Sequence, residues 1–139
     1  MSNEMTLEAL RSVPLFASLT DAATIELRSL LAIKDVSAGT ELFHKDDTGD
    51  AMYLIESGRV RISITDEDRK VITLAELAQG DFFGEMSIID GRKRSADATV
   101  IENGRLAVLP RPNFLSFVRA RGHILYRQQT AKLDRRCVS

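Results

Sequence analysis

The chain has 139 residues, of which 44% are hydrophobic and 28% are charged, and its net charge is −1. This length is enough for one domain with a real core and too short for two, and the ordinary balance of apolar and charged residues excludes a disordered chain. A net charge so close to zero excludes a general attraction to nucleic acid or to a membrane surface. We therefore expect a single domain over residues 1–139.

Two further absences narrow the class of protein. Cys137 is the only cysteine, which excludes an internal disulfide and a cysteine-ligated metal cluster. The first residues lack the basic and apolar regions of a signal peptide, and no apolar run approaches the roughly 20 residues needed to span a bilayer. We expect a cytoplasmic protein with no membrane span.

The N-terminal part carries apolar residues at helical spacing. Leu7, Leu10 and Val13 recur every three residues and predict a short helix that ends near Pro14. N-cap chemistry for a second helix is offered by Ser18, Thr20 and Asp21. The buried stripe of that second helix is predicted to consist of Ala23, Leu27, Leu30 and Leu31. We expect helices over about residues 5–32, with a structural role only.

After the second helix the hydrophobic period changes to two, which is typical of strands. Ile62 and Ile64 alternate with polar residues, as expected of a half-buried antiparallel strand. Ser57-Gly58 predicts a tight turn, and Asn103-Gly104 predicts a two-residue hairpin. Many short strands joined by turns predict a mainly β fold over about residues 33–110, namely an antiparallel roll or barrel with flanking helices.

The C-terminal part returns to helical composition. Pro112 is well placed in the first turn of a helix, and Gly122 is a predicted stop or hinge. The last segment, Ile124 to about Arg136, has helical composition but only a weak apolar stripe. We expect C-terminal helices over about residues 112–136. This part is locally basic, but it shows neither a helix-turn-helix pattern nor aromatic residues interleaved with the basic ones. We expect no direct DNA binding.

The stretch from Gly80 to Ala96 carries the chemistry of a phosphate-binding site. Glu85 begins a very short predicted helix and can accept hydrogen bonds from a sugar hydroxyl. Arg94 offers a planar fork of donors that matches a phosphate, which a lysine would meet only as a point charge. Gly84 allows a close approach of the backbone. Neutral N–H donors come from the turn at residues 86–89 and from the residues around 95.

This stretch resembles the phosphate-binding cassette of the cyclic-nucleotide-binding domains found in bacterial catabolite-activator-type regulators, protein kinase A regulatory subunits and nucleotide-gated channels. The family pattern is Phe-Gly-Glu-Leu-Ala followed by Arg-(Ser/Thr/Ala)-Ala. Here residues 83–87 read Phe-Gly-Glu-Met-Ser and residues 94–96 read Arg-Ser-Ala. Met86 is close to leucine in volume. Together with residues 14–16 and 50–60, the resemblance extends from about Leu7 to about Leu133.

The resemblance implies a fold and a ligand. The fold would be an antiparallel β-roll of the jelly-roll-like, double-stranded β-helix type, with a short cassette helix. Glu85 would bind the ribose 2′-hydroxyl and Arg94 the cyclic phosphate, with Ser95 assisting. The ligand would be cAMP or cGMP, with cAMP preferred, and no metal, cofactor or catalytic residue is expected. The implied ligand-binding residues are Phe83, Gly84, Glu85, Met86, Ser87, Arg94, Ser95, Ala96, Ile62, Val71 and Leu74. Of these residues, Ile62, Val71 and Leu74 would face the base.

The chain departs from the DNA-binding relatives at its end. It stops at Ser139, about where their last helix begins to reach the base, so we expect no output domain of its own. The expected function is a stand-alone cyclic-mononucleotide sensor that signals to an unidentified effector protein through its C-terminal helices. A helix as short and weakly apolar as Ile124–Arg136 would make a poor coiled coil, so we expect a monomer or a weak homodimer.

Other functions remain as alternatives. A domain of this fold that no longer binds nucleotide would serve as an interaction module, but Glu85 and Arg94 are both present. A cyclic dinucleotide would need a larger and more open site. A phosphodiesterase would need a metal cluster or a positioned general base, and the two histidines, His44 and His123, are far apart in sequence. We therefore expect a binding protein and not an enzyme.

Overall fold

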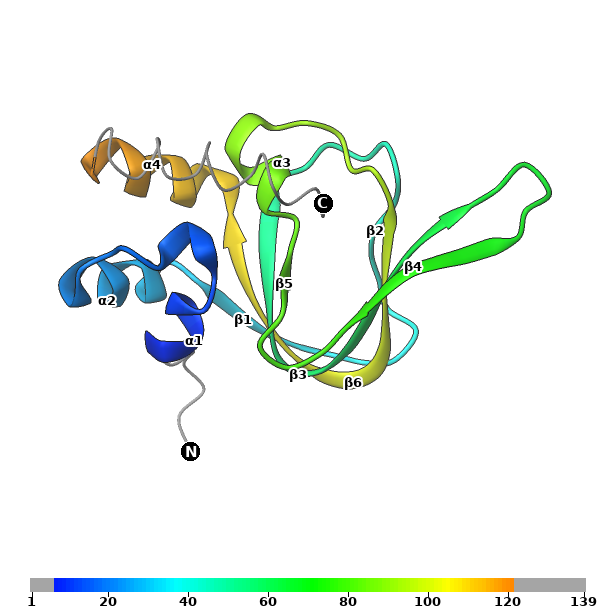
Figure 1. The fold of residues 1–139 in the computed structure, drawn as a ribbon, viewed down its shortest axis with the longest axis horizontal. Coiled ribbons are helices and arrows are strands. Elements are labelled where there is room, and N and C mark those ends of the chain that lie inside the picture. The colour runs from blue at the N-terminus through cyan, green and yellow to red at the C-terminus, as the bar shows by residue number, and fades with distance from the viewer. Residues whose placement is uncertain (1–6, 122–139) are drawn as a thin grey trace.

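The computed structural model describes residues 7–121, which form an antiparallel sheet with most of the helices gathered on one side of it (Figure 1). The predicted hinge at Gly122 and the predicted helix Ile124–Arg136 lie outside the described residues. No helix among the described residues combines the length and the apolar character needed to cross a lipid bilayer.

The helices on that side come from both ends of the described chain (Figure 1). They are α1 (Leu7–Arg11), the 3-10 helix η1 (Pro14–Phe16), α2 (Asp21–Ser29) and α4 (Arg111–Arg121). The hydroxyl of Thr20 accepts a hydrogen bond of 3.2 Å from the backbone N–H of Ala23, which is the N-cap expected for α2. Pro14 stands in the first turn of η1, where its missing N–H costs nothing.

Within residues 7–121, six strands make up the sheet, and every pairing is antiparallel. The main order is β1-β6-β3-β4, while β2 pairs with β6 and β5 pairs with β3. The strands are β1 (Ala32–Val36), β2 (Glu41–Phe43), β3 (Ala51–Thr65), β4 (Val71–Leu77), β5 (Phe82–Phe83) and β6 (Asp97–Pro110). The mainly β fold with a few helices is the β-roll that was predicted.

Two predicted turns are wrong, and both lie at the same place in the sheet. Ser57-Gly58 lies inside the continuous strand β3, and Asn103-Gly104 lies inside the continuous strand β6. The pairing register of these two strands shifts around Ser57 and Arg59, as in a β-bulge. A Cβ on Gly58 would lie 2.8 Å from the Cα of Gly104. The glycines therefore permit two long strands to bend while in close contact, which a sequence pattern does not distinguish from a turn.

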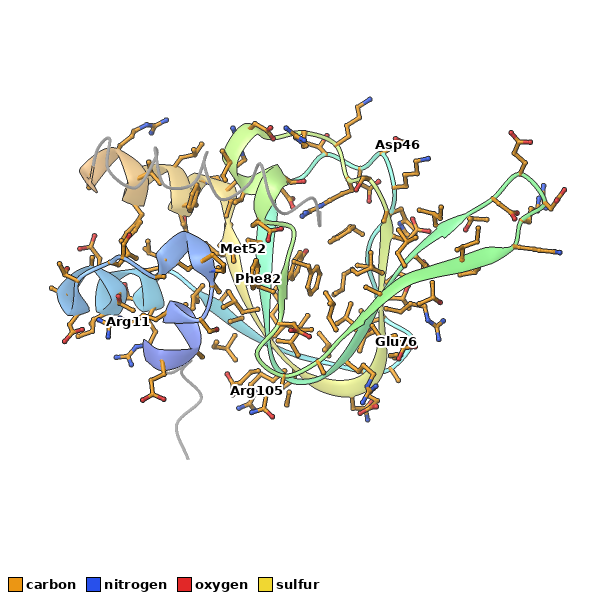
Figure 2. The ribbon with its side chains drawn as sticks, viewed as in Figure 1. Arg11, Asp46, Met52, Glu76, Phe82 and Arg105 are labelled. Atoms are coloured by element: carbon orange, nitrogen blue, oxygen red, sulfur yellow. The ribbon has the colours of Figure 1, made fainter. Side chains whose placement is uncertain are left out.

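The sheet separates two hydrophobic cores, because successive residues of β3 and β6 point to opposite faces. The helix-side core includes Met52 from β3, which Figure 2 shows pointing toward the helices, together with Leu109 from β6 and Phe114 from α4. The roll-side core takes the alternate residues, including Ile55 from β3 and Val108 from β6. The helices therefore cover one face of the sheet, and the other face curls around its own core.

Candidate functional site

The short helix α3 (Glu85–Asp90) begins directly after β5, and Gly84 is its N-cap residue. Gly84 has a φ of +83°, in the left-handed region that glycine adopts without strain. This backbone places Glu85 at the first position of the helix, where a carboxylate is favoured by the helix dipole. The Glu85 side chain is only 2% exposed. The sequence therefore places a buried acid where the strand ends.

Arg94 is the largest buried charged side chain of the described residues, with 1% exposure. Its Nη2 donates a hydrogen bond of 2.7 Å to the carbonyl oxygen of Ala51 and lies 3.9 Å from Oδ1 of Asp50. Its Nε and Nη1 are buried and have no hydrogen-bond partner among the described residues. Burial lowers the pKa of Arg94, although a guanidinium stays protonated at neutral pH. A buried guanidinium with two unpaired nitrogens is costly, and an anion would compensate that cost.

The backbone around Arg94 is fixed by the loop between β2 and β3, on which Figure 2 labels Asp46. The N–H of Asp46 donates to the carbonyl oxygen of Arg94, and the N–H of Arg94 donates to that of Asp47, each at 2.8 Å. The N–H of Gly49 donates to the carbonyl oxygen of Arg92 at 3.3 Å. Arg94 is therefore held in place by a second segment of the chain.

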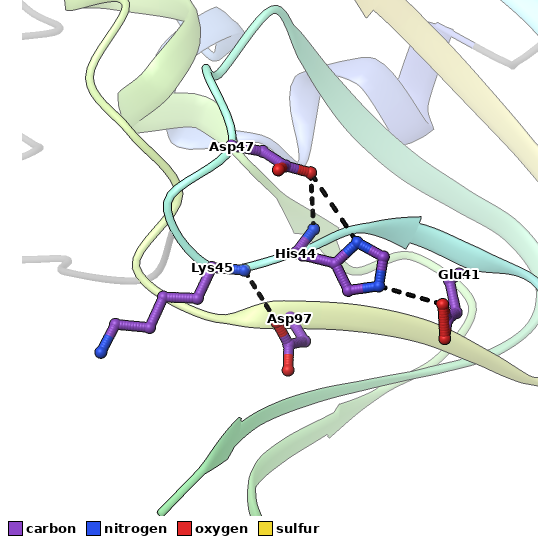
Figure 3. Close-up of polar contacts among 5 residues, drawn as sticks. All are labelled: Glu41, His44, Lys45, Asp47 and Asp97. Atoms are coloured by element: carbon purple, nitrogen blue, oxygen red, sulfur yellow. Dashed lines mark hydrogen bonds and ion pairs between the residues drawn. The ribbon is translucent and has the colours of Figure 1, made fainter.

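That loop has its own polar network at its start (Figure 3). The Nε2 of His44 lies 3.0 Å from Oε1 of Glu41, and Oδ2 of Asp47 accepts a 2.9 Å hydrogen bond from the backbone N–H of His44. The N–H of Lys45 donates to Oδ1 of Asp97 at 2.7 Å. The hydrogen bond to Glu41 raises the pKa of His44. The hydrogen bond from Lys45 to Asp97 ties the start of the loop to the strand that follows Arg94.

The structure brings several of the predicted site residues together. A Cβ on Gly84 would lie 2.6 Å from Nη1 of Arg94, so the glycine N-cap and the arginine are in direct contact. Phe83 and Ala96 belong to the roll-side core, and Ser95 is exposed beside Arg94. Ser87 is buried against Gly49. Of Met86 only the backbone, within α3, is described.

The three residues predicted to face the base differ in exposure. Ile62 is buried in the roll-side core. Val71 and Leu74 are 60% and 56% exposed, on the β3–β4 hairpin that projects away from the helices in Figure 1. Val71 pairs with Thr65, on the opposite face of the hairpin from Ile62. Val71 and Ile62 therefore lie on opposite faces of the hairpin, and Leu74 stands at the register shift of β4. That these three residues face the base stays a prediction.

Sequence reasoning did not single out the aromatic residues around Arg94. The ring of Phe43 lies beneath the guanidinium, with 4.0 Å between its centroid and Cζ, and the centroid of Tyr53 lies 5.8 Å from the same atom. Phe43 belongs to β2 and Tyr53 to β3, both far from Arg94 in the sequence. Alternating apolar residues in strands carry no signal that would distinguish these two rings from ordinary core residues.

The fold and the site together define a class of protein: a β-roll domain with a buried arginine beside a short helix. A family model, the cyclic nucleotide-binding domain, matches residues 33–121. The chain belongs to this family of cyclic nucleotide-binding domains.

Individual proteins of similar sequence or structure support this family membership. The cyclic AMP receptor protein of Thermus thermophilus is 34% identical over 110 residues, which are 79% of this chain and 51% of that protein. The N-terminal domain of a transcriptional regulator from Streptomyces coelicolor A3(2) superposes with a TM-score of 0.82 at 29% identity, covering 91% of this chain and 90% of that one. The cAMP-bound structure of PfPKA-R gives a TM-score of 0.76 at 31% identity, covering 81% of this chain and 40% of that one. The chain thus spans about half the length of the Thermus protein.

Proposed function

We propose that this domain is a cytoplasmic sensor that binds a cyclic mononucleotide, cAMP in preference to cGMP, without consuming it. The observation that carries the proposal is Arg94, whose buried guanidinium leaves Nε and Nη1 without a protein partner among the described residues. A cyclic phosphate is an anion of the size and charge that such a group would bind. The preference for cAMP is supported by a relative named as a cyclic AMP receptor protein and by the cAMP-bound neighbour.

Each part of the site has a distinct role in this proposal. Arg94 and the exposed Ser95 would hold the phosphate, and Glu85 would accept hydrogen bonds from the ribose. Charge-assisted hydrogen bonds contribute roughly 1.5–3 kcal/mol each. Three or four of them, less the cost of ordering the ligand, correspond to a micromolar dissociation constant, or about −8 kcal/mol.

The start of α4 is the element through which binding would be passed to a partner protein. The N–H of Arg111 donates a hydrogen bond of 2.7 Å to the carbonyl oxygen of Asp50, the residue that precedes the Ala51 carbonyl bound to Arg94. A Cβ on Gly91, which ends α3, would lie 3.3 Å from Cζ of Arg111. A ligand that shifts the site would therefore displace the start of α4 through its contacts with Asp50 and with Gly91. An effector would bind differently according to the position of the C-terminal helices.

The test is calorimetric titration of the protein with cAMP and with cGMP, on the wild type and on Arg94→Ala. Arg59→Ala is the matched control, because Arg59 lies on the outer surface in ion pairs with Glu76 and Glu102. We expect micromolar binding that Arg94→Ala weakens at least tenfold and Arg59→Ala leaves unchanged. The absence of heat and of a thermal shift with both nucleotides would contradict the proposal, and cyclic dinucleotides would then be titrated.

The same samples separate a binding protein from an enzyme. We expect cAMP incubated with the protein for hours to be recovered intact, as measured by chromatography. Formation of a linear nucleotide at a rate proportional to the protein concentration would contradict the sensor and support a hydrolase.

A further inference from the structure

The guanidinium of Arg94 rests on an aromatic surface. The ring of Phe43 lies 4.0 Å from Cζ of Arg94, well within the distance of about 6 Å at which a cation and the face of a ring attract each other. Phe43 and Arg94 are both buried, so water screens this attraction only weakly. Phe43 stands in β2, and the loop that follows it supplies the backbone hydrogen bonds to Arg94.

The ring of Phe43 is itself held by two other rings. Its centroid lies 5.9 Å from that of Tyr53 and 6.1 Å from that of Phe83, both in tilted arrangements. Tyr53 and Phe83 stack on each other at 4.9 Å with an interplanar angle of 9°. These distances are typical of favourable aromatic pairs. Phe43 is therefore a fixed surface and not a side chain that adapts to whatever lies above it.

Three contacts restrain the guanidinium of Arg94, and none of the three is a hydrogen bond to a carboxylate. Phe43 lies against its face, the carbonyl oxygen of Ala51 takes Nη2 at 2.7 Å, and Gly84 leaves room for Nη1. The nearby carboxylate of Asp50 lies 3.9 Å from Nη2, and its side chain is 82% exposed. An aromatic face attracts a cation without using any of its N–H donors. Nε and Nη1 therefore stay available to an anion.

We propose that Phe43 is a positioning residue for the phosphate of the ligand. It holds the guanidinium of Arg94 in one orientation, with Nε and Nη1 free for the anion, so that an incoming phosphate need not displace a carboxylate. This inference rests on the proposed function of the site. Its quantitative consequence is that removal of the ring weakens the affinity for cAMP by about three- to tenfold, which is the range expected for a partly desolvated cation–π contact.

The experiment compares four proteins by calorimetric titration with cAMP: the wild type, Phe43→Leu, Phe43→Tyr and Phe16→Leu. Phe43→Leu removes the ring but keeps an apolar side chain, and Phe43→Tyr restores an aromatic face. Phe16→Leu is the matched control, because Phe16 is equally buried but belongs to the helix-side core. The unfolding free energy of each variant is measured by urea denaturation. We expect affinity to fall only in Phe43→Leu, while Phe43→Leu and Phe16→Leu lose similar stability.

A double-mutant cycle with Arg94→Met distinguishes positioning from general damage to the core. A methionine carries no cation that the ring could attract or orient, so Phe43→Leu should weaken binding less than twofold in the Arg94→Met background. An equal loss of affinity in both backgrounds, or no loss in Phe43→Leu, would overturn the inference while leaving wild-type binding intact. A wild type that does not bind cAMP would instead overturn the proposed function.

Discussion

The two cores on either side of the sheet are built from the same strands but differ in what they bury. The helix-side core, represented by Met52, Leu109 and Phe114, packs apolar side chains from helices and strands against each other. The roll-side core includes Phe43, whose ring is in contact with the buried guanidinium of Arg94. Burying a charge beside apolar side chains costs stability unless the charge is paired. The difference indicates that the helix-side core stabilises the fold, whereas the roll-side core loses stability by burying the guanidinium of Arg94.

The largest expected effect is on the helix-side core. Phe114→Ala removes a fully buried ring by which α4 packs into the helix-side core, and such truncations cost about 3–5 kcal/mol in the free energy of unfolding. Because Phe114 does not belong to the roll-side core, the dissociation constant for cAMP should change less than threefold wherever the variant is folded. Urea denaturation and calorimetric titration measure the two quantities. An affinity loss above tenfold would show that the two cores are not separate in function.

Arg94→Met should show the opposite pattern. The substitution places an apolar side chain of similar length in the roll-side core, and replacing a buried charged group in this way is often neutral or stabilising by about 1–4 kcal/mol. The affinity for cAMP should fall about 100-fold, or about 2.7 kcal/mol, because the charge-assisted hydrogen bonds to the phosphate are lost. A variant destabilised by several kcal/mol would show that Arg94 serves the fold and not the ligand.

Gly84→Ala should affect stability and affinity together, because Gly84 has a left-handed backbone conformation and also lies against Arg94. Its φ of +83° would cost an alanine about 1–2 kcal/mol, and the added Cβ would lie 2.6 Å from Nη1 of Arg94. Displacement of the guanidinium should weaken cAMP binding about tenfold. Gly80→Ala is the matched control, since Gly80 has a φ of +89° and no atom of the described residues lies within 4 Å of the added Cβ. It should lose similar stability without losing affinity.

The smallest expected effect concerns His44, at the edge of the loop that holds Arg94. Its pKa in the folded protein is raised above 6.5, chiefly because the ring is hydrogen-bonded to Glu41, with the charges of Asp47 and Asp97 adding to the effect. Its stabilising contribution is therefore complete below about pH 6.5 and is lost as the pH rises through the raised pKa. The thermal midpoint of the wild type should fall slightly over that interval, relative to His44→Gln. Identical pH profiles for the two proteins would contradict this assignment.

The sequence predicted the parts of the site that depend on local chemistry. Gly84, Glu85 and Arg94 were identified because residue type and spacing over a short stretch carry the signal, and the structure places Gly84 against Arg94. The bends at Gly58 and Gly104 were read as turns, since the close contact of two distant glycines leaves no local trace.

Two further features that local patterns did not specify have the same cause. The approach of Phe43 to Arg94 and the exposure of Val71 depend on the pairing of strands that are far apart along the chain. Local patterns indicate that a residue belongs to a strand, but the face it occupies depends on register, and one bulge changes it.

The central claim is that Arg94 is buried for binding and not for stability. Its most direct test is a paired measurement on the wild type and Arg94→Met, namely the free energy of unfolding without ligand and the dissociation constant for cAMP. For Arg94→Met we expect an unfolding free energy that is unchanged or higher than that of the wild type, and an affinity for cAMP that is about 100-fold weaker. A less stable variant that still binds cAMP as tightly as the wild type would contradict it.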